Sequence, residues 1–149
     1  MSRIIPILTE RTITRKINLK RMEDIAIESS EQSERVTIPE IMPIQDMTKV
    51  ISEWDMNRKI YYGDETMRHN KNNVKDVPQQ ITHASGAILI GPEGGFSINE
   101  IDFLKSKNFV IPINFGPRVL RSDTAVISGL VFWHIINGDM KNYSQNNIL

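Results

Sequence analysis

The strongest structural signal in this chain comes from Ile90-Gly91-Pro92-Glu93-Gly94-Gly95-Phe96 and from Asn114-Phe115-Gly116-Pro117-Arg118-Val119-Leu120-Arg121-Ser122-Asp123-Thr124-Ala125. Each stretch follows an apolar run that is typical of a β-strand and precedes a pattern that is typical of a helix. Glycine leaves room for a ligand beside the backbone, and exposed backbone amides often bind phosphates and nucleotides. Because one helix separates the two stretches, we expect them to form two walls of a single pocket.

Neither stretch matches a known nucleotide-binding fingerprint. The first lacks the Lys-Ser/Thr of a P-loop, and its Gly-x-x-Gly-Gly spacing differs from the Gly-x-Gly-x-x-Gly of a dinucleotide fold. Taken alone, residues 91–95 are also explained by a tight turn from strand to helix, and Arg118 and Arg121 by ordinary surface charges. The joint occurrence of the two stretches favours a ligand pocket.

Helical and strand patterns alternate along the chain, which predicts an α/β fold with a mainly parallel sheet flanked by helices. The strand patterns cover residues 4–8, 37–42, 58–62, 87–90 and 109–113. The continuous apolar run at 87–90 predicts a strand that is buried on both faces. The expected helix caps are Asn18, Asp46, Ser97 with Glu100 in a capping box, and Ser122 or Asp123. Asn108, in the left-handed conformation, and Gly138 are expected to end the last two helices.

Apolar periodicity predicts which face of each helix points inward. The expected inward residues are Met22, Ile25, Ala26 and Ser29; Met47, Val50, Ile51 and Trp54; Ile101 and Leu104; and Ile127, Leu130, Val131 and His134. Residues 64–82 are polar and lack periodicity, which indicates a surface loop or a segment that folds down over a ligand. The polar tail at 139–149 is expected to fray.

The composition excludes several kinds of site. The 149 residues suit one domain, and 40% of them are apolar, which is ordinary for a globular protein. Cysteine is absent, so disulfides, thiolate metal sites and cysteine nucleophiles are excluded. The three histidines show no metal-ligand spacing, and we expect no metal. No apolar run approaches the roughly 20 residues that span a bilayer, and no signal-peptide pattern opens the chain, so we expect a cytoplasmic protein.

Charge is balanced overall but unevenly distributed. The net charge is zero, which argues against a strongly basic, sequence-independent nucleic-acid binder. Residues 1–21 nevertheless hold six basic side chains against one acid, and residues 23–34 hold five acids. This asymmetry indicates either a solvated surface or a basic N-terminal edge that meets phosphate.

The two glycine stretches, followed along the chain, closely resemble those of the RsmE-type 16S rRNA uridine-N3 methyltransferases, which belong to the SPOUT superfamily. The matching blocks are Ile90 to Ser97 with Glu100, and Phe115 to Ala125. A third block comprises Thr9-Glu10-Arg11-Thr12, Ile25-Ala26-Ile27-Glu28, Glu31-Gln32-Ser33-Glu34-Arg35 and Pro39. The resemblance runs from about residue 4 to about residue 138 and is weakest across 64–82.

The chain departs from the family pattern at three positions. Phe115-Gly116 stands where the family usually has Leu-Gly, and Met22 stands where a tryptophan is common. Asp123-Thr124-Ala125 stands where the family usually has Glu-Thr-Ala. The side chain of Asp123 reaches less far than a glutamate, which weakens the case for a carboxylate role at this position. The PUA-like barrel of the family has no counterpart, so residues 1–149 are expected to be the catalytic SPOUT domain alone.

The resemblance implies a deep C-terminal trefoil knot, a homodimer, and S-adenosylmethionine bound in a bent shape between the two glycine turns. The cofactor-binding residues that it implies are Gly91, Pro92, Glu93, Gly94, Gly95, Phe115, Gly116, Val119 and Leu120. The expected partner is 16S rRNA in the small ribosomal subunit, held in part by Arg11 and Arg118. The implied activity is methylation of N3 of a specific uridine.

The chemistry of this reaction limits the catalytic candidates. Neutral uracil N3 carries a proton, so a base or a donor that stabilises the uridinate oxygens is needed. Arg121 could stabilise charge on O2 or O4 or hold a phosphate, and Asp123 could accept the proton, orient Arg121 or simply cap a helix. Methylation of pyrimidine C5 generally needs a cysteine and is therefore excluded.

Two alternatives remain open. One is a non-catalytic cofactor- or RNA-binding remnant of such an enzyme. The other is ribose 2′-O methylation, which is disfavoured because the knotted enzymes of that class usually carry Ser-Leu-Asn where this chain has Val119-Leu120-Arg121.

Overall fold

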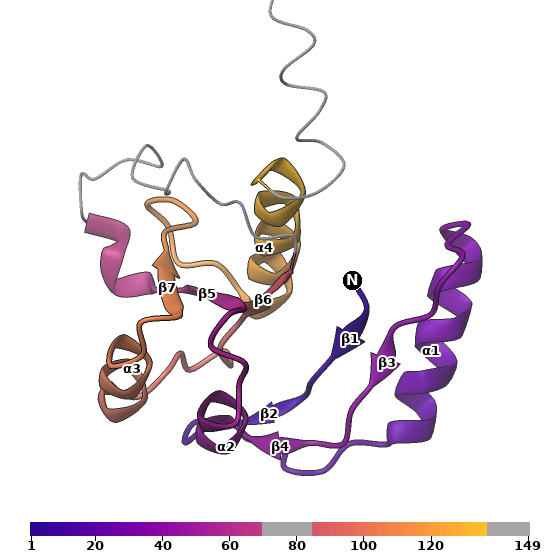
Figure 1. Ribbon diagram of the computed structural model, residues 1–149, viewed down its shortest axis with the longest axis horizontal. Coiled ribbons are helices and arrows are strands. Elements are labelled where there is room, and N and C mark those ends of the chain that lie inside the picture. The colour runs from indigo at the N-terminus through magenta and orange to yellow at the C-terminus, as the bar shows by residue number, and fades with distance from the viewer. Residues whose placement is uncertain (70–84, 137–149) are drawn as a thin grey trace, which may run out of the picture. The chain divides into compact units, whose positions relative to one another are not determined.

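The computed structural model describes residues 1–69 and 85–136 (Figure 1). The chain divides into two compact units, Met1–Trp54 and Asp55–Leu149, and each is described by itself. Three of the expectations fall on residues outside the described part: most of the polar segment at 64–82, the helix end at Gly138, and the tail at 139–149.

The first unit contains two short pairs of parallel strands. Strand β1 (Arg3–Ile4) pairs with β3 (Glu40–Ile41), and β2 (Ile7–Leu8) pairs with β4 (Gln45–Asp46). Pro6 lies between β1 and β2, and its lack of an N–H donor explains why the first apolar run is divided. The expected strands at 4–8 and 37–42 are therefore present but shorter.

Helix α1 (Leu19–Gln32) begins as predicted, because the side chain of Asn18 accepts a hydrogen bond from the Arg21 amide at 3.0 Å. The expected inward face is wrong in part. Ala26 is buried, but Ile25 is 51% exposed and the second buried residue is Ser30. Ser30 tolerates burial because its hydroxyl donates to the Ala26 carbonyl at 2.7 Å.

Helix α2 (Met47–Ser52) confirms its predicted cap and face. The Asp46 carboxylate accepts hydrogen bonds from the Thr48 amide at 2.8 Å and the Lys49 amide at 3.3 Å. Met47 and Ile51 are almost completely buried.

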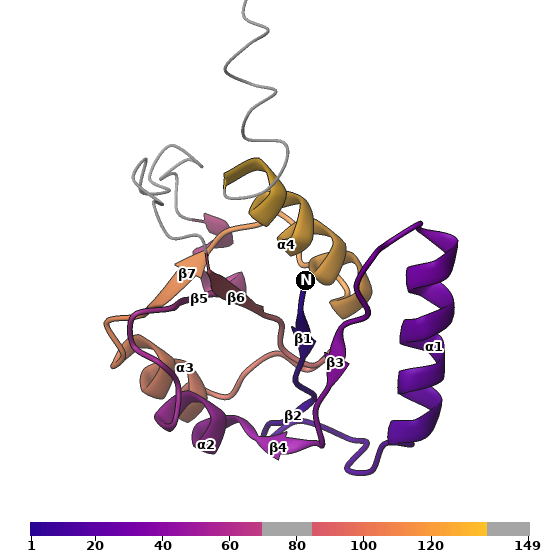
Figure 2. The ribbon, with the colours of Figure 1, turned by 45° about the vertical axis from the view of Figure 1, so that its right-hand side comes forward.

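The second unit is built on a parallel sheet with the strand order β6-β5-β7. The strands are β5 (Lys59–Gly63), β6 (Gly86–Leu89) and β7 (Val110–Ile113). Ile60 of β5 is paired with Ala87 of β6 on one side and with Val110 of β7 on the other. Helix α4 (Ser122–Ile136) packs along β6, and helix α3 (Ile98–Lys105) packs along β7 (Figure 2). The predicted α/β class with parallel strands is confirmed.

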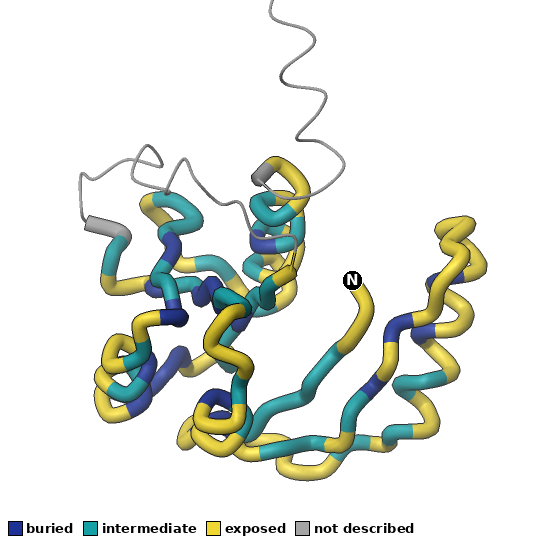
Figure 3. The backbone as a smooth tube through the Cα atoms, viewed as in Figure 1, coloured by how far each residue is buried: buried dark blue, intermediate teal, exposed yellow. Residues whose placement is uncertain are grey.

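Burial is greatest on the central strand β5, not on β6 (Figure 3). Ile60, Tyr61 and Tyr62 are nearly inaccessible, whereas Leu89 is the single buried residue of β6. The expectation that 87–90 is buried on both faces is wrong, because β6 forms an edge of the sheet within the described residues. Successive side chains of a strand point to opposite faces, so Tyr61 contacts Phe132 and Trp133 of α4 while Tyr62 contacts Phe96.

Helix α3 (Ile98–Lys105) confirms the predicted capping box, in which Ser97 and Glu100 bond each other's amides at 3.1 and 2.8 Å. Leu104 is fully buried, as expected. The predicted end is wrong. The helix closes at Ser106, whose φ is −70°, and Glu34 is the one described non-glycine residue with a positive φ, so Asn108 is not left-handed.

Helix α4 (Ser122–Ile136) begins one residue earlier than predicted, because the Arg121 carbonyl accepts its first hydrogen bond, from the Ala125 amide at 2.8 Å. Its expected inward face is also wrong. Ile127, Val131 and His134 are exposed, whereas Gly129 is buried. A Cβ at Gly129 would lie 2.8 Å from the Ile88 side chain, so glycine allows close approach of α4 to β6.

Candidate functional site

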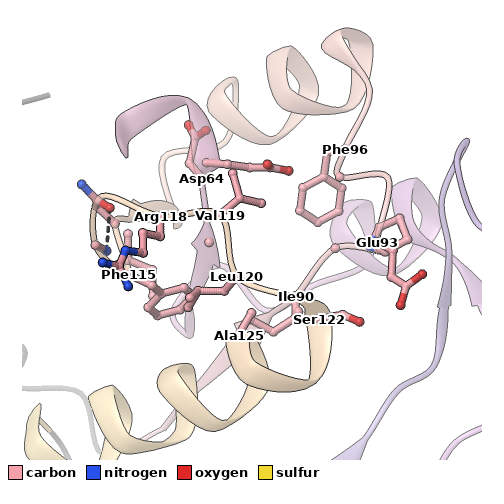
Figure 4. A pocket seen from close by; sticks show the side chains of 18 residues that line it. Asp64, Ile90, Glu93, Phe96, Phe115, Arg118, Val119, Leu120, Ser122 and Ala125 are labelled. Carbon is pink, nitrogen blue, oxygen red and sulfur yellow. Dashed lines mark hydrogen bonds between the residues drawn. The ribbon is translucent and has the colours of Figure 1, made fainter. Parts of the chain in front are cut away.

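Three segments of the second unit, distant in sequence, form one pocket (Figure 4). They are the end of β5, the turn between β6 and α3, and the turn between β7 and α4. The residues that line the pocket are Gly63, Asp64, Glu65, Ile90, Gly91, Pro92, Glu93, Gly95, Phe96, Ile113, Asn114, Phe115, Gly116, Arg118, Val119, Leu120, Ser122 and Ala125. The two glycine turns therefore meet, as the sequence predicts.

The first turn is shaped by close packing of its backbone. The Gly95 amide donates to the Pro92 carbonyl at 2.8 Å, and Gly95 has a φ of +67°, which disfavours any side chain. A Cβ at Gly91 would lie 3.1 Å from the ring of Phe96. Phe96 is buried and packs edge-on against Tyr62, with 6.2 Å between ring centroids. The turn is thus anchored on the central strand.

The second turn is held by Asn114. Its Oδ1 accepts a hydrogen bond from the Gly116 amide at 2.8 Å, and its Nδ2 donates to the Met67 carbonyl at 3.1 Å. Gly116 has a φ of +116°, and an added Cβ would find no atom within 4 Å. Gly95 and Gly116 are the two glycines of the described chain with positive φ, and both line the pocket.

Phe115 explains one departure from the family pattern. An added Cβ at Gly63 would lie 2.8 Å from its ring, and one at Gly129 would lie 3.4 Å from it. The ring therefore fills the space between β5 and α4 that two glycines leave, and a residue larger than the usual leucine is accommodated.

The sequence predicted a surface loop at 64–82, or a segment that folds down over a ligand, and did not predict the wall at the end of β5 from Asp64 and Glu65. Residues Glu65–His69 form a short 3-10 helix, and the Asp64 side chain is 1% exposed. Asp64 accepts hydrogen bonds from the Thr66 amide at 2.9 Å, the Thr66 hydroxyl at 2.6 Å and the Tyr62 hydroxyl at 3.2 Å. Lys105 of α3 lies 3.4 Å from its Oδ2. The one sequence signal for this wall was acidic residues directly after a strand.

These contacts set the ionisation of Asp64. Burial raises the pKa of the carboxyl group. The hydrogen bonds from Thr66, the Lys105 ammonium and the Tyr62 hydroxyl lower this pKa, and together they outweigh burial. The net effect is a lowered pKa. Burial, with the adjacent Asp64 charge, raises the pKa of Tyr62. Asp64 is therefore a structural anion that holds the third wall in place.

The predicted catalytic pair lies at the start of α4. Arg121 is 3.8 Å from Glu93 of the first turn, and both side chains are largely exposed. Asp123 is exposed and accepts a hydrogen bond from the Thr124 amide at 2.7 Å. That hydrogen bond is the largest cause of the lowered pKa of Asp123. Desolvation opposes it, while the Thr124 hydroxyl and the Arg121 charge lower the pKa as well. Neither residue lines the pocket, although their neighbours Leu120 and Ser122 do.

The structure brings most of the predicted ligand residues together. Those that line the pocket are Gly91, Pro92, Glu93, Gly95, Phe115, Gly116, Arg118, Val119 and Leu120. Gly94 is exposed and does not line it. Arg11 belongs to the first unit, in the turn closed by the Thr9 carbonyl and the Thr12 amide, and its RNA contact stays a prediction.

Two kinds of site are not found among the residues that the structure describes. No group of three histidine or acidic side chains there could hold a metal ion. No helix within 1–69 and 85–136 has the length and apolar character to cross a bilayer.

A model of a known family, the RNA methyltransferase domain, matches residues 1–133. The chain belongs to this family. Curated relatives named ribosomal RNA small subunit methyltransferase E include one from Rickettsia conorii, 32% identical over 133 residues, and one from Mesomycoplasma hyopneumoniae, 38% identical over 110. These matches cover 87% and 73% of this chain but 52% and 45% of the relatives, so the chain spans about half their length.

Solved RNA methyltransferase structures share the fold. A putative methyltransferase from Legionella pneumophila, solved with bound SAM, is 30% identical, with a TM-score of 0.73 over 89% of this chain and 55% of that one. The small subunit methyltransferase E of Neisseria gonorrhoeae, solved with S-adenosyl methionine, has a TM-score of 0.78 at 23% identity over 89% of this chain and 54% of that one. The resemblance to this methyltransferase family that the glycine stretches indicated is confirmed.

Proposed function

We propose that this chain is a catalytic domain that transfers a methyl group from S-adenosylmethionine to N3 of a uridine in 16S rRNA. The observation that carries the proposal is the meeting of the two glycine turns at one pocket, in a chain of the RNA methyltransferase family. The names of the relatives support small-subunit rRNA as the substrate, which would place the chain in the cytoplasm.

The pocket residues fit the proposed cofactor. Gly95 and Gly116 line the pocket on the two turns, and the space beside Gly116 is open where any other residue would project a side chain. Apolar side chains beside them, including Ile90, Phe96 and Leu120, suit the faces of an adenine ring. The glycines and these side chains would hold the cofactor.

The bound cofactor would supply an electrophilic methyl group. The chain must then align uracil N3 with that group and favour loss of the N3 proton. We assign to Arg121 the stabilisation of negative charge on the uracil oxygens. Because its lowered pKa makes Asp123 a weak base, we assign it the orientation of Arg121. Arg118, at the pocket, and Arg11 are proposed to contact RNA phosphates.

We also propose that residues 1–149 form one SPOUT domain with a deep trefoil knot. The support is the similarity to the two solved methyltransferases, each of which matches 89% of the chain across both compact units.

A homodimer is proposed on the exposed face of α4. Ile127, Val131 and Ile135 are 47–64% exposed and repeat every four residues, which places them on one helix face. An apolar stripe of this kind is typical of a helix that packs against a partner, and the proposed partner is a second copy of the chain.

Two separate measurements test the proposed function. Calorimetric titration with S-adenosylmethionine measures binding, and mass analysis of nucleosides from 30S subunits incubated with labelled cofactor measures methylation. We expect both binding and the appearance of N3-methyluridine. Binding without methylation would favour the remnant, an alternative supported by the net charge of zero. Methylation of a ribose would overturn the assignment to uridine N3.

A further inference from the structure

The carboxylate of Glu65 occupies an unusual place in the pocket. Glu65 follows the buried Asp64 and lines the pocket from the end of β5. Its Oε1 lies so close to Gly95 of the first glycine turn that a Cβ at Gly95 would collide with it. The glycine thus makes room for a carboxylate that comes from 30 residues earlier in the chain.

The position of Glu65 is fixed by its neighbours on both sides. Asp64 is held by Thr66, Tyr62 and Lys105, as described above. The Met67 amide donates to the Asp64 carbonyl at 3.1 Å, and the Met67 carbonyl accepts from Asn114 of the second turn at 3.1 Å. Glu65 therefore stands on a turn that is bonded to α3 and to the second glycine turn.

The acidic side chains that line the pocket differ in whether they form an ion pair. Its lining includes three acids and one base: Asp64, Glu65, Glu93 and Arg118. Asp64 has Lys105 as a partner, and Glu93 has Arg121. Among the side chains that the structure describes, no ion pair is recorded for Glu65. Glu65 itself is exposed. A carboxylate that lines a pocket favours a cationic over a neutral ligand, and a ligand seated against it excludes part of the water that screens the attraction.

We propose that Glu65 selects the cationic methyl donor over its neutral demethylated product. This inference rests on the proposed function, in which S-adenosylmethionine is the donor. The donor carries a sulfonium charge, and S-adenosylhomocysteine carries a neutral thioether in its place. The adenosine and the amino-acid portion are the same in both molecules. A carboxylate that acts on the sulfonium therefore favours exchange of product for fresh donor.

The test compares the affinities of three ligands for the wild-type chain and for Glu65→Gln, which removes the charge and keeps the shape. Calorimetry should show S-adenosylmethionine binding weakened by about tenfold, a typical effect of one charge-assisted interaction. S-adenosylhomocysteine should weaken by less than about threefold. Sinefungin, which carries an amine in place of the sulfonium, should weaken as much as the donor.

Asp102→Asn is the matched control, because it removes one acid from an exposed position of α3 that does not line the pocket. It should leave all three affinities unchanged, and circular dichroism should show that both variants are folded. Equal loss for donor and product would overturn the inference, since Glu65 would then hold a group that both share. Unchanged affinities in Glu65→Gln would overturn it as well. If the wild-type chain itself bound no S-adenosylmethionine, the proposed function would fail instead.

Discussion

At the scale of single residues, the pocket depends on two glycines whose backbone conformations exclude side chains for different reasons. Gly95 has a positive φ and no space, because Glu65 occupies the place of a Cβ. Gly116 has a positive φ and free space. The first glycine is required by a neighbour as well as by the backbone, and the second by the backbone alone.

Replacing each glycine with alanine separates these causes. Gly116→Ala should lower the free energy of unfolding by about 1 kcal/mol, the cost of a side chain at positive φ. Gly95→Ala should cost a similar amount, because its φ of +67° is left-handed and the end of the flexible Glu65 side chain can turn away, but it displaces that carboxylate from the pocket wall. Both should weaken S-adenosylmethionine binding at least tenfold, measured by calorimetry on the folded variants. Unchanged affinity in both would remove the glycine turns from the cofactor site.

The ionisation of Asp64 predicts a specific pH dependence of stability. Its pKa is lowered in the folded chain, so its stabilising effect is present above the unfolded value of about 4 and is lost as pH falls through the folded value. Asp64→Asn should cost about 1–3 kcal/mol at pH 7, because it removes the charge that four donors share. Denaturant titrations should show this cost shrinking below about pH 4. A cost that stays constant from pH 7 to pH 2.5 would contradict the lowered pKa.

Arg121 is accessible to substrate, since its pairing with Glu93 is exposed and such pairs contribute little stability. Arg121→Ala should leave S-adenosylmethionine affinity unchanged and lower turnover by about two orders of magnitude, the usual loss when one charge-stabilising group is removed. Arg121→Lys should recover part of the rate. Full activity in the alanine variant would exclude Arg121 from the catalytic site.

At the scale of secondary structure elements, the contact of α4 with β6 positions the second glycine turn. Gly129 brings the helix close to Ile88 and to the ring of Phe115, and Phe132 and Trp133 pack on Tyr61. The start of α4 carries Ser122 and Ala125 into the pocket wall. The distance between α4 and the sheet therefore determines the shape of the site.

Gly129→Val tests this coupling. Its side chain would overlap Ile88 and force α4 away from the sheet, which should cost about 1–3 kcal/mol in thermal or denaturant unfolding. Cofactor affinity should fall as well, although residue 129 does not line the pocket. Ser128→Val, on the adjacent half-buried position, serves as the control for a branched residue in the same helix. Equal stability of the two variants would mean that α4 tolerates displacement.

The sequence predicted the N-caps of the helices better than their buried faces. The caps at Asn18, Asp46 and Ser97 were predicted correctly, because each depends on a side chain and an amide within three residues of each other. The inward faces of α1 and α4 were predicted wrongly in part. In both helices a small or polar residue, Ser30 or Gly129, is buried, and residues expected to face inward, such as Ile25 in α1 and Ile127 in α4, are exposed.

At the scale of the whole molecule, the exposed apolar stripe of α4 carries the proposal of a homodimer. Ile127→Glu should shift the chain from dimer to monomer in light scattering coupled to size-exclusion chromatography, because a charge would be buried at the interface. Ile98→Glu is the matched control, since Ile98 is also exposed, at 74%, but lies on α3. A wild-type chain that is monomeric at micromolar concentration would contradict the dimer.

Local patterns were sufficient to predict the parallel α/β class, the N-caps of α1, α2 and α3 and the meeting of the two glycine turns. Capping depends on neighbours along the chain, and parallel strands end at the same edge of a sheet. The wall at Asp64 and Glu65, the packing of Phe115 between Gly63 and Gly129, and the buried faces of the helices could not be derived in this way. These features arise where segments separated by tens of residues come within a few ångströms of each other. Close approach there selects small residues and buried charges, which hydrophobic periodicity does not detect.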